Sequence, residues 1–210
     1  MATAEPSLTR LDAPNLPNPI ILMLHGGKPS SRDEVGERSA SWLRSSWMAR
    51  AISGRANAAG ASVWLLRYRE RGWNGGSGPV ADARWALDCV RATRGDVPVV
   101  LLGHSMGGRV AVHVADDPSV VGVVALAPWW SSAEPVRTLT GRSLVAAHGR
   151  RDRLTSFAQT QRFVERARAV ATDAELVDMG PRGHYLIAGA NEWNDVALES
   201  SLRMLDADRP

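Results

Sequence analysis

Residues 103–108, which read Gly-His-Ser-Met-Gly-Gly, follow an apolar run and precede a segment with helical character. Gly103 and Gly107 flank Ser105, where a strand that turns at once into a helix leaves no room for side chains. Such a turn exposes the serine hydroxyl at the carboxyl edge of a sheet and aims the positive end of the helix dipole at it. The segment therefore predicts a strand, a sharp turn and a helix.

Apolar runs alternate along the chain with segments of helical periodicity. The expected strands cover residues 20–24, 62–67, 97–102, 120–127, 143–147 and 175–179, and the expected helices cover residues 42–60, 79–94, 106–116, 157–171 and 193–205. Strands that alternate with helices favour a parallel sheet with right-handed crossovers and helices on both faces. We therefore predict a three-layer α/β/α sandwich with a reduced, mostly parallel sheet of six strands.

The chain is long enough for one buried core and short for two, at 210 residues. Residues 1–19 hold four prolines and little apolar periodicity. This pattern favours an N-terminal arm over residues 1–18 that lies on the surface rather than a pair of strands. No internal repeat or linker interrupts the rest, so residues 19–210 are expected to form a single domain.

Charge and hydropathy argue against several classes of partner. The sequence pI is near 9.7, but the arginines are scattered among 22 acidic residues and Lys28 is the only lysine. Nucleic-acid binding would require basic residues clustered on one element, so none is expected. The N-terminus has no signal-like pattern and no apolar run could cross a bilayer, which favours a cytoplasmic protein without membrane contact. The oligomeric state is left open.

A serine, an acid and a histidine follow three of the expected strands at their carboxyl ends. Ser105 comes first, then Asp152 in His-Gly-Arg-Arg-Asp-Arg, then His184 in Gly-Pro-Arg-Gly-His. In a parallel sheet such ends gather at one edge. There Ser105 would attack an acyl carbonyl, His184 would take and return the proton, and Asp152 would orient the imidazole. Asp178 is the rival acid, but it lies inside the last expected strand.

Two backbone amides are candidates for the oxyanion hole. The N–H of Met106 follows the serine, and a second N–H would come from the His-Gly-Gly turn at residues 25–27, with Gly27 the best placed. Both would stabilise the negative charge that forms on the acyl oxygen in the transition state.

Four segments together resemble the α/β-hydrolase superfamily over residues 20–205. Residues 103–108 are similar to its nucleophile elbow, residues 25–27 to its oxyanion turn, residues 148–152 to its acid loop and residues 183–184 to its histidine loop. The resemblance implies the α/β-hydrolase fold and a serine hydrolase that cleaves small or medium acyl esters or thioesters through an acyl-enzyme at Ser105.

The chain departs from the family pattern at two places. Residues 1–18 leave no room for the two strands that usually precede the oxyanion strand, and only about a dozen irregular residues stand where many members insert a lid. These departures imply a lidless, six-stranded form without a cap domain and with a shallow, open site. The alternatives are amidase, peptidase or perhydrolase chemistry on the same three residues, or a binding module on the same fold.

Further residues could contact the small-molecule acyl substrate. Trp129 and Trp130 follow the fourth expected strand and either line the cleft or cover the core in place of a lid, and Lys28 adjoins the oxyanion turn. Asp152 is surrounded by arginines at positions 150, 151 and 153. These arginines are either solvated surface charges or groups that attract an anionic substrate. No histidine pair has metal-ligand spacing with acidic partners, so neither a metal nor another cofactor is expected.

Overall fold

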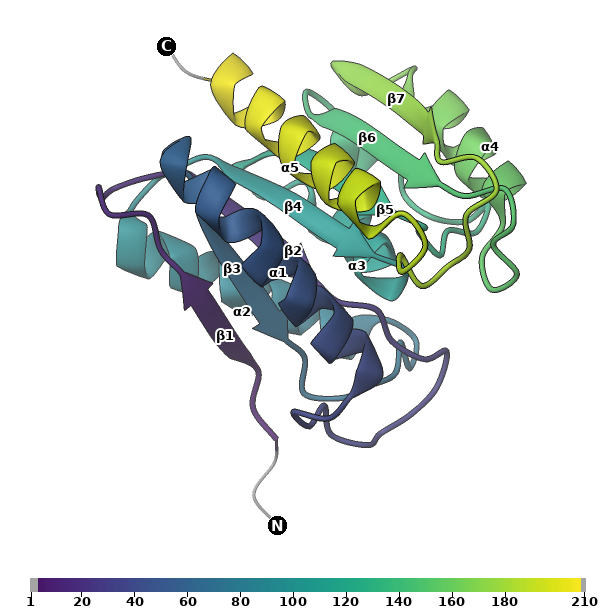
Figure 1. The fold of residues 1–210 in the computed structure, drawn as a ribbon, viewed down its shortest axis with the longest axis horizontal. Coiled ribbons are helices and arrows are strands. Elements are labelled where there is room, and N and C mark those ends of the chain that lie inside the picture. Colours follow the sequence, from purple (N-terminus) through teal and green to yellow (C-terminus); the bar gives the residue numbers. More distant parts are fainter. Residues whose placement is uncertain (1–3, 209–210) are drawn as a thin grey trace.

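The computed structural model describes residues 4–208 (Figure 1). Its strands are β1 (Ser7–Leu11), β2 (Ile20–Leu24), β3 (Ser62–Arg67), β4 (Val99–His104), β5 (Val120–Leu126), β6 (Ser143–His148) and β7 (Asp173–Asp178). Its α-helices are α1 (Ala40–Ala58), α2 (Ser77–Arg94), α3 (Met106–Val114), α4 (Phe157–Ala167) and α5 (Ala190–Ala207), with a short 3-10 turn η1 (Arg137–Leu139). Strands and helices thus alternate as the apolar pattern predicts.

All seven strands join one sheet, in the order β1-β3-β2-β4-β5-β6-β7. Strand β1 runs antiparallel to β3, and the other neighbours are parallel. The chain passes from β2 outward to β3 and then returns across β2 to β4. Connections therefore leave β2 and β4 in opposite directions, which opens a crevice at the carboxyl ends of these two strands.

The helices form two layers, one on each face of the sheet. Helices α1 and α5 cover one face, and α2, α3 and α4 cover the other (Figure 1). Strand β2 is buried along its whole length and serves both layers because its side chains alternate. Ile20, Leu22 and Leu24 pack with α2 and α3, whereas Ile21 and Met23 pack with α1 and α5. The three-layer α/β/α prediction is confirmed.

The prediction of six strands is wrong by one, because residues 7–11 form the edge strand β1 within the predicted arm. An edge strand pairs with a neighbour on one side only, so it can form with few apolar residues. The prolines before and after β1 do not interrupt it. Two contacts to Trp64 of β3 hold this segment: the indole N–H donates to Asp12 at 2.7 Å, and the Arg10 guanidinium lies 4.2 Å from the ring centroid. Residues 1–3 and 209–210, at the ends of the predicted arm and domain, lie outside the described residues.

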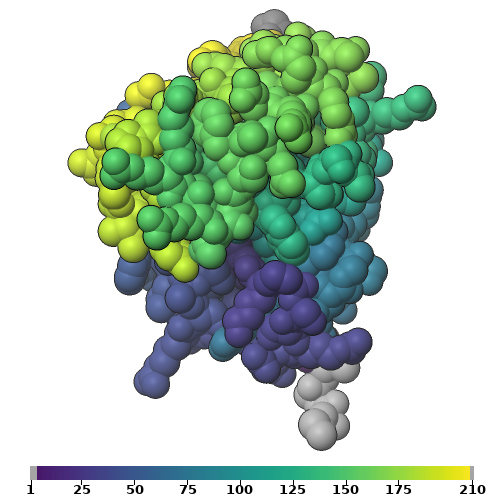
Figure 2. Space-filling view, turned by 90° about the vertical axis from the view of Figure 1, so that its right-hand side faces the viewer, coloured from purple at the N-terminus to yellow at the C-terminus, as the bar shows by residue number. Residues whose placement is uncertain are grey.

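The connection from β5 to β6 carries no inserted cap. Residues 127–142 contain only the 3-10 turn η1 and irregular backbone, as the sequence predicts. Within the described residues this connection therefore places no cap over the carboxyl ends of the parallel strands, and Figure 2 looks onto this edge. Within residues 4–208, no helix is both long enough and apolar enough to cross a membrane.

Candidate active site

Ser105 lies at the corner between β4 and α3 with φ 55° and ψ −115°. This is a left-handed backbone conformation that a residue with a side chain adopts only when its surroundings enforce it. The flanking glycines are sterically required. A β-carbon on Gly103 would lie 2.5 Å from the Gly107 carbonyl carbon, and one on Gly107 would overlap the carbonyl oxygen of Leu24. The predicted elbow is thus formed, and it leaves the serine side chain at the crevice beside β2.

The side chains of Ser105, His184 and Asp152 converge, although they are far apart in sequence. The Nε2 atom of His184 lies 3.0 Å from the Ser105 Oγ, and its Nδ1 atom lies 2.8 Å from the Asp152 Oδ2. Because an ionised carboxylate only accepts hydrogen bonds, Nδ1 carries the proton, and Nε2 is left to accept the serine proton. The imidazole therefore has the tautomer that a general base for Ser105 requires.

The carboxylate of Asp152 is held by several donors from its own loop. The backbone N–H groups of Leu154 and Thr155 both donate to Oδ1 at 2.8 Å, and the Thr155 hydroxyl lies 2.8 Å from Oδ2. The His148 Nε2 lies 3.3 Å from the same Oδ2. Burial alone would raise the pKa of Asp152, but the hydrogen bonds from His148, His184 and these amides outweigh it and hold the pKa well below its ordinary value. Asp152 is therefore ionised.

The rival acid, Asp178, is engaged elsewhere. Its Oδ2 atom lies 2.6 Å from the Arg150 guanidinium on the protein surface. Hydrogen bonds from Arg150 and from the Gly180 amide lower the pKa of Asp178, and neither contact leads toward His184. The sequence-based preference for Asp152 over Asp178 agrees with this geometry.

The predicted oxyanion turn, residues 25–27 after β2, is fixed by His25. Its ring donates from Nδ1 to the Gly26 carbonyl oxygen at 2.6 Å and accepts from the Tyr68 amide at Nε2, 3.3 Å away. Burial lowers the pKa of His25 to about 4, so the ring stays neutral and keeps both bonds. A β-carbon on Gly27 would lie 2.5 Å from the Met106 side chain. The turn thus lies directly against the start of α3, where the Met106 N–H has no acceptor within its helix.

A pocket of about 340 Å³ opens beside Ser105. Its lining comes from the loop after β2 with the predicted oxyanion turn, from α1, from the end of β4 with the elbow, and from the loops after β3, β6 and β7: Gly26, Gly27, Lys28, Ser39, Ala40, Ser41, Arg44, Arg71, His104, Ser105, Leu154, His184 and Tyr185. In Figure 2 the purple loop that follows β2 lies opposite the green loop that follows β6. Lys28 is one of these lining residues, as its place next to the predicted oxyanion turn suggests.

The two tryptophans after β5 have different positions. Trp130 is 1% exposed, stacks on Phe163 with the ring centroids 4.1 Å apart, and donates its indole N–H to the Gly108 carbonyl at 3.0 Å. Trp130 thus belongs to the core, which corrects its suggested contact with substrate. Trp129 is half-buried and lines a depression beside the acid loop together with Leu154 and Thr155. A substrate contact by Trp129 stays a prediction.

Sequence reasoning missed several residues of this site. Thr155 contacts both Asp152 and His184, and the only signal for it is its position three residues after the acid. Arg44 and Arg71 also line the pocket, but one lies in the helix α1 and the other in the loop after β3, and neither position carries a motif that indicates a site. Within residues 4–208, no group of three or more His, Cys, Asp or Glu side chains could hold a metal ion.

The α/β sandwich of this chain is a fold shared with solved hydrolase structures. The chain has a TM-score of 0.70 to an alpha-beta serine hydrolase homologue from Coxiella burnetii, at 16% identity over 93% of this chain and 91% of the other. For Est1E from Butyrivibrio proteoclasticus with ferulic acid bound, the TM-score is 0.70, at 11% identity over 96% of each chain. For XC6422 from Xanthomonas campestris, a serine hydrolase without a lid, it is 0.64, at 19% identity over 95% and 94%.

The family model of the alpha/beta hydrolase family matches residues 21–205. The chain therefore belongs to the alpha/beta hydrolase family. No curated protein matches it.

Proposed function

We propose that this protein is a serine esterase that cleaves small or medium carboxylic esters or thioesters through an acyl-enzyme. The observation that carries the proposal is the continuous path from the Ser105 Oγ to the His184 Nε2 at 3.0 Å and from the His184 Nδ1 to Asp152 at 2.8 Å. Membership of a hydrolase family supports the general reaction, and two fold neighbours, Est1E with ferulic acid and a lidless serine hydrolase, fit this class.

In the first half-reaction the Ser105 Oγ attacks the acyl carbonyl carbon while its proton moves to the His184 Nε2. The carbonyl π electrons move onto the oxygen, and the amides of Gly27 and Met106 stabilise this oxyanion. As the oxyanion collapses, the bond to the leaving alcohol or thiol breaks, and His184 returns its proton to the leaving group. Asp152 stabilises the imidazolium formed between these steps because its carboxylate is ionised.

The second half-reaction repeats these steps with water. His184 takes a proton from the water as its oxygen attacks the acyl carbon, and then returns this proton to the Ser105 Oγ when the acyl bond breaks. The products are a carboxylic acid and the free enzyme. Since residues 127–142 insert no lid over the site, activity on dispersed esters should not require activation at a lipid interface.

Labelling with a fluorophosphonate and the burst of p-nitrophenol from p-nitrophenyl acetate test this proposal. We expect the wild type to be labelled at Ser105, and the Ser105→Ala variant to lose the label and at least about 10⁴-fold in kcat. Ser77→Ala, which changes an exposed serine at the start of α2, is the matched control and should behave as the wild type. A wild type that neither takes the label nor releases p-nitrophenol would contradict the proposal.

A further inference from the structure

Three cationic side chains line the pocket beside Ser105, and they come from three separate segments. Lys28 follows the oxyanion turn, Arg44 lies in α1, and Arg71 lies in the loop between β3 and α2. Among the described residues that line this pocket, none carries a carboxylate. The pocket therefore has charges of one sign on its walls.

No ion pair within residues 4–208 neutralises these three cations. Arg44 packs on the Tyr185 ring with its guanidinium 4.8 Å from the ring centroid, and Arg71 donates from Nε to the backbone carbonyl of Glu34 at 3.0 Å. Burial lowers the pKa of Arg44, whereas the hydrogen bond that Arg150 donates to Asp178 raises the pKa of Arg150. Arg44 is thus partly buried without the carboxylate partner that Arg150 has.

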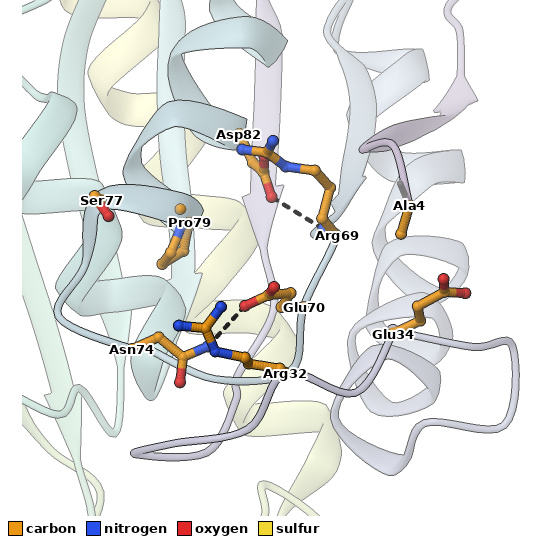
Figure 3. A pocket seen from close by; sticks show the side chains of 10 residues that line it. Ala4, Arg32, Glu34, Arg69, Glu70, Asn74, Ser77, Pro79 and Asp82 are labelled. Atoms are coloured by element: carbon orange, nitrogen blue, oxygen red, sulfur yellow. Dashed lines mark hydrogen bonds and ion pairs between the residues drawn. The ribbon is translucent and has the colours of Figure 1, made fainter. Parts of the chain in front are cut away.

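Acidic residues on the same loops face a different pocket. Figure 3 shows this second pocket, of about 440 Å³, where Glu34, Glu70 and Asp82 lie among its lining residues. There Asp82 pairs with Arg69 at 2.6 Å, and Glu70 accepts from the Asn74 amide at 2.8 Å. Glu34, Glu70 and Asp82 therefore line a different pocket from the one that holds the cations beside Ser105.

Asp152 is the carboxylate nearest the reacting centre, and its charge is already compensated. Its side chain is 1% exposed and lies behind His184, where it accepts from His184, from Thr155 and from the Leu154 amide. It therefore presents no free oxygen to Lys28, Arg44 or Arg71.

A cleft lined by charges of one sign attracts ligands of the opposite sign, and guanidinium groups bind carboxylate and phosphate oxygens through paired N–H donors. We propose that the pocket beside Ser105 binds a negatively charged group, a carboxylate or a phosphate, carried by the ester substrate. This inference rests on the proposed function only in that the bound molecule is the ester cleaved by Ser105.

Two exposed side chains with apolar surface that line the same pocket indicate which other part such a substrate contains. Leu154 and Tyr185 are 58% and 52% exposed, respectively. These side chains expose apolar surface that a ligand can cover. The substrate is therefore an amphipathic ester, with its apolar part against Leu154 and Tyr185 and its anionic part toward Lys28 and Arg71.

Three matched pairs of esters, each with a neutral and an anionic member, test the inference and locate the charge. They are p-nitrophenyl hexanoate with p-nitrophenyl hydrogen adipate, methyl meta-acetoxybenzoate with meta-acetoxybenzoate, and para-acetoxyanisole with para-acetoxyphenyl phosphate. The first pair places a carboxylate on the acyl side, the second places it on the alcohol side, and the third replaces it with phosphate. We expect at least one anionic ester to exceed its neutral partner in kcat/KM by about tenfold at low ionic strength.

The Lys28→Gln, Arg71→Gln double variant should reduce this ratio of anionic to neutral kcat/KM to about one, since the attraction depends on these charges. The control is Arg50→Gln, which removes an exposed positive charge from the same helix as Arg44 without touching the pocket. It should keep the wild-type ratio. Added salt should reduce the wild-type ratio, because screening weakens attraction between exposed charges.

A binding measurement separates failure of this inference from failure of the proposed function. In the Ser105→Ala background, uncleaved p-nitrophenyl hydrogen adipate and para-acetoxyphenyl phosphate are titrated by calorimetry, with and without the two Gln substitutions. Tighter binding of an anionic ester that disappears with these substitutions supports the inference even if turnover is absent. Equal kcat/KM for both members of every pair in an active wild type would overturn it while the esterase proposal stands. The inference is also overturned, and the esterase proposal stands, if the double variant and the Arg50→Gln variant have the same ratio of anionic to neutral kcat/KM.

Discussion

The ring of His104 donates a hydrogen bond from Nε2 to the backbone carbonyl oxygen of His184, 3.0 Å away. The residue that precedes Ser105 in the elbow therefore holds the loop that carries the proposed base. Burial lowers the pKa of His104 to about 3, so the ring is neutral and keeps its proton on Nε2. The two rings lie with their centroids 5.0 Å apart. His104 is thus a positioning residue for His184.

We expect His104→Phe to lower kcat by about 10- to 100-fold, because the His184 loop loses its anchor and small displacements of a base are costly. His104→Gln is the matched control, since its amide can donate to the same carbonyl and should restore most of kcat. Rates per active site are obtained by counting fluorophosphonate-labelled enzyme. If the Phe and Gln variants show the same rate per labelled site, the hydrogen bond has no positioning role.

The Thr155 hydroxyl contacts both the Asp152 Oδ2, at 2.8 Å, and the His184 Nδ1, at 3.2 Å. Thr155→Val keeps the shape of the side chain but removes the donor to the carboxylate. We expect kcat to fall by about tenfold and the acid limb of the pH–rate profile to shift, since one hydrogen bond to a charged group contributes about 1.5–3 kcal/mol. Thr155→Ser keeps the hydroxyl and should retain activity and profile. Unchanged kcat in Thr155→Val would exclude this role.

The elbow and the order of the three site residues could be predicted from sequence because their requirements are local. Gly103, Ser105 and Gly107 are dictated by one tight turn. The acid follows a strand with a continuous apolar run at residues 144–147, and the histidine follows the last expected strand. Asp152 could be preferred over Asp178 on the same ground, since only Asp152 lies beyond a strand end. The sheet edge at which they meet then follows from parallel topology.

Features that depend on tertiary partners could not be predicted in this way. Strand β1 has few apolar residues, and its pairing with β3 joins residues 52 to 60 positions apart in the sequence. Adjacent tryptophans at positions 129 and 130 look alike in sequence, but only Trp130 reaches Phe163. The cations beside Ser105 were missed, apart from Lys28, because whether an arginine finds a carboxylate depends on which loops meet in the fold.

Gly107 is the elbow position with the least space, since a β-carbon there would overlap the carbonyl oxygen of Leu24. Backbone on both sides prevents relief, so we expect Gly107→Ala to reduce the free energy of unfolding by at least about 3 kcal/mol. The matched control is Gly54→Ala within α1, where a β-carbon meets no atom within 4 Å. It should stabilise the protein by about 0.5–1 kcal/mol. Urea unfolding of both variants measures these effects, and a Gly107→Ala variant as stable as the wild type would contradict the steric argument.

Glu134 is a buried carboxylate outside the active site, and it connects α3 to the loop after β5. Its oxygens lie 2.7 Å from the Arg109 guanidinium, 2.7 Å from the His113 Nε2 and 2.8 Å from the Ser131 hydroxyl. Burial alone would raise the pKa of Glu134, but the hydrogen bonds from His113, Ser131 and Arg109 outweigh it and lower the pKa to about 2, from an ordinary value of 4.5.

Because the folded-state pKa of Glu134 lies below its unfolded value, its ionisation stabilises the fold above pH 4.5, and this contribution is lost as the pH falls toward 2. We expect Glu134→Gln to lower the free energy of unfolding at neutral pH by on the order of 2 kcal/mol. The difference from the wild type should shrink as the pH falls below 4.5, since protonated Glu134 resembles glutamine. Urea unfolding of both proteins between neutral pH and pH 3 measures this difference. A gap that stays constant over that range would show that the ionised carboxylate contributes nothing to stability.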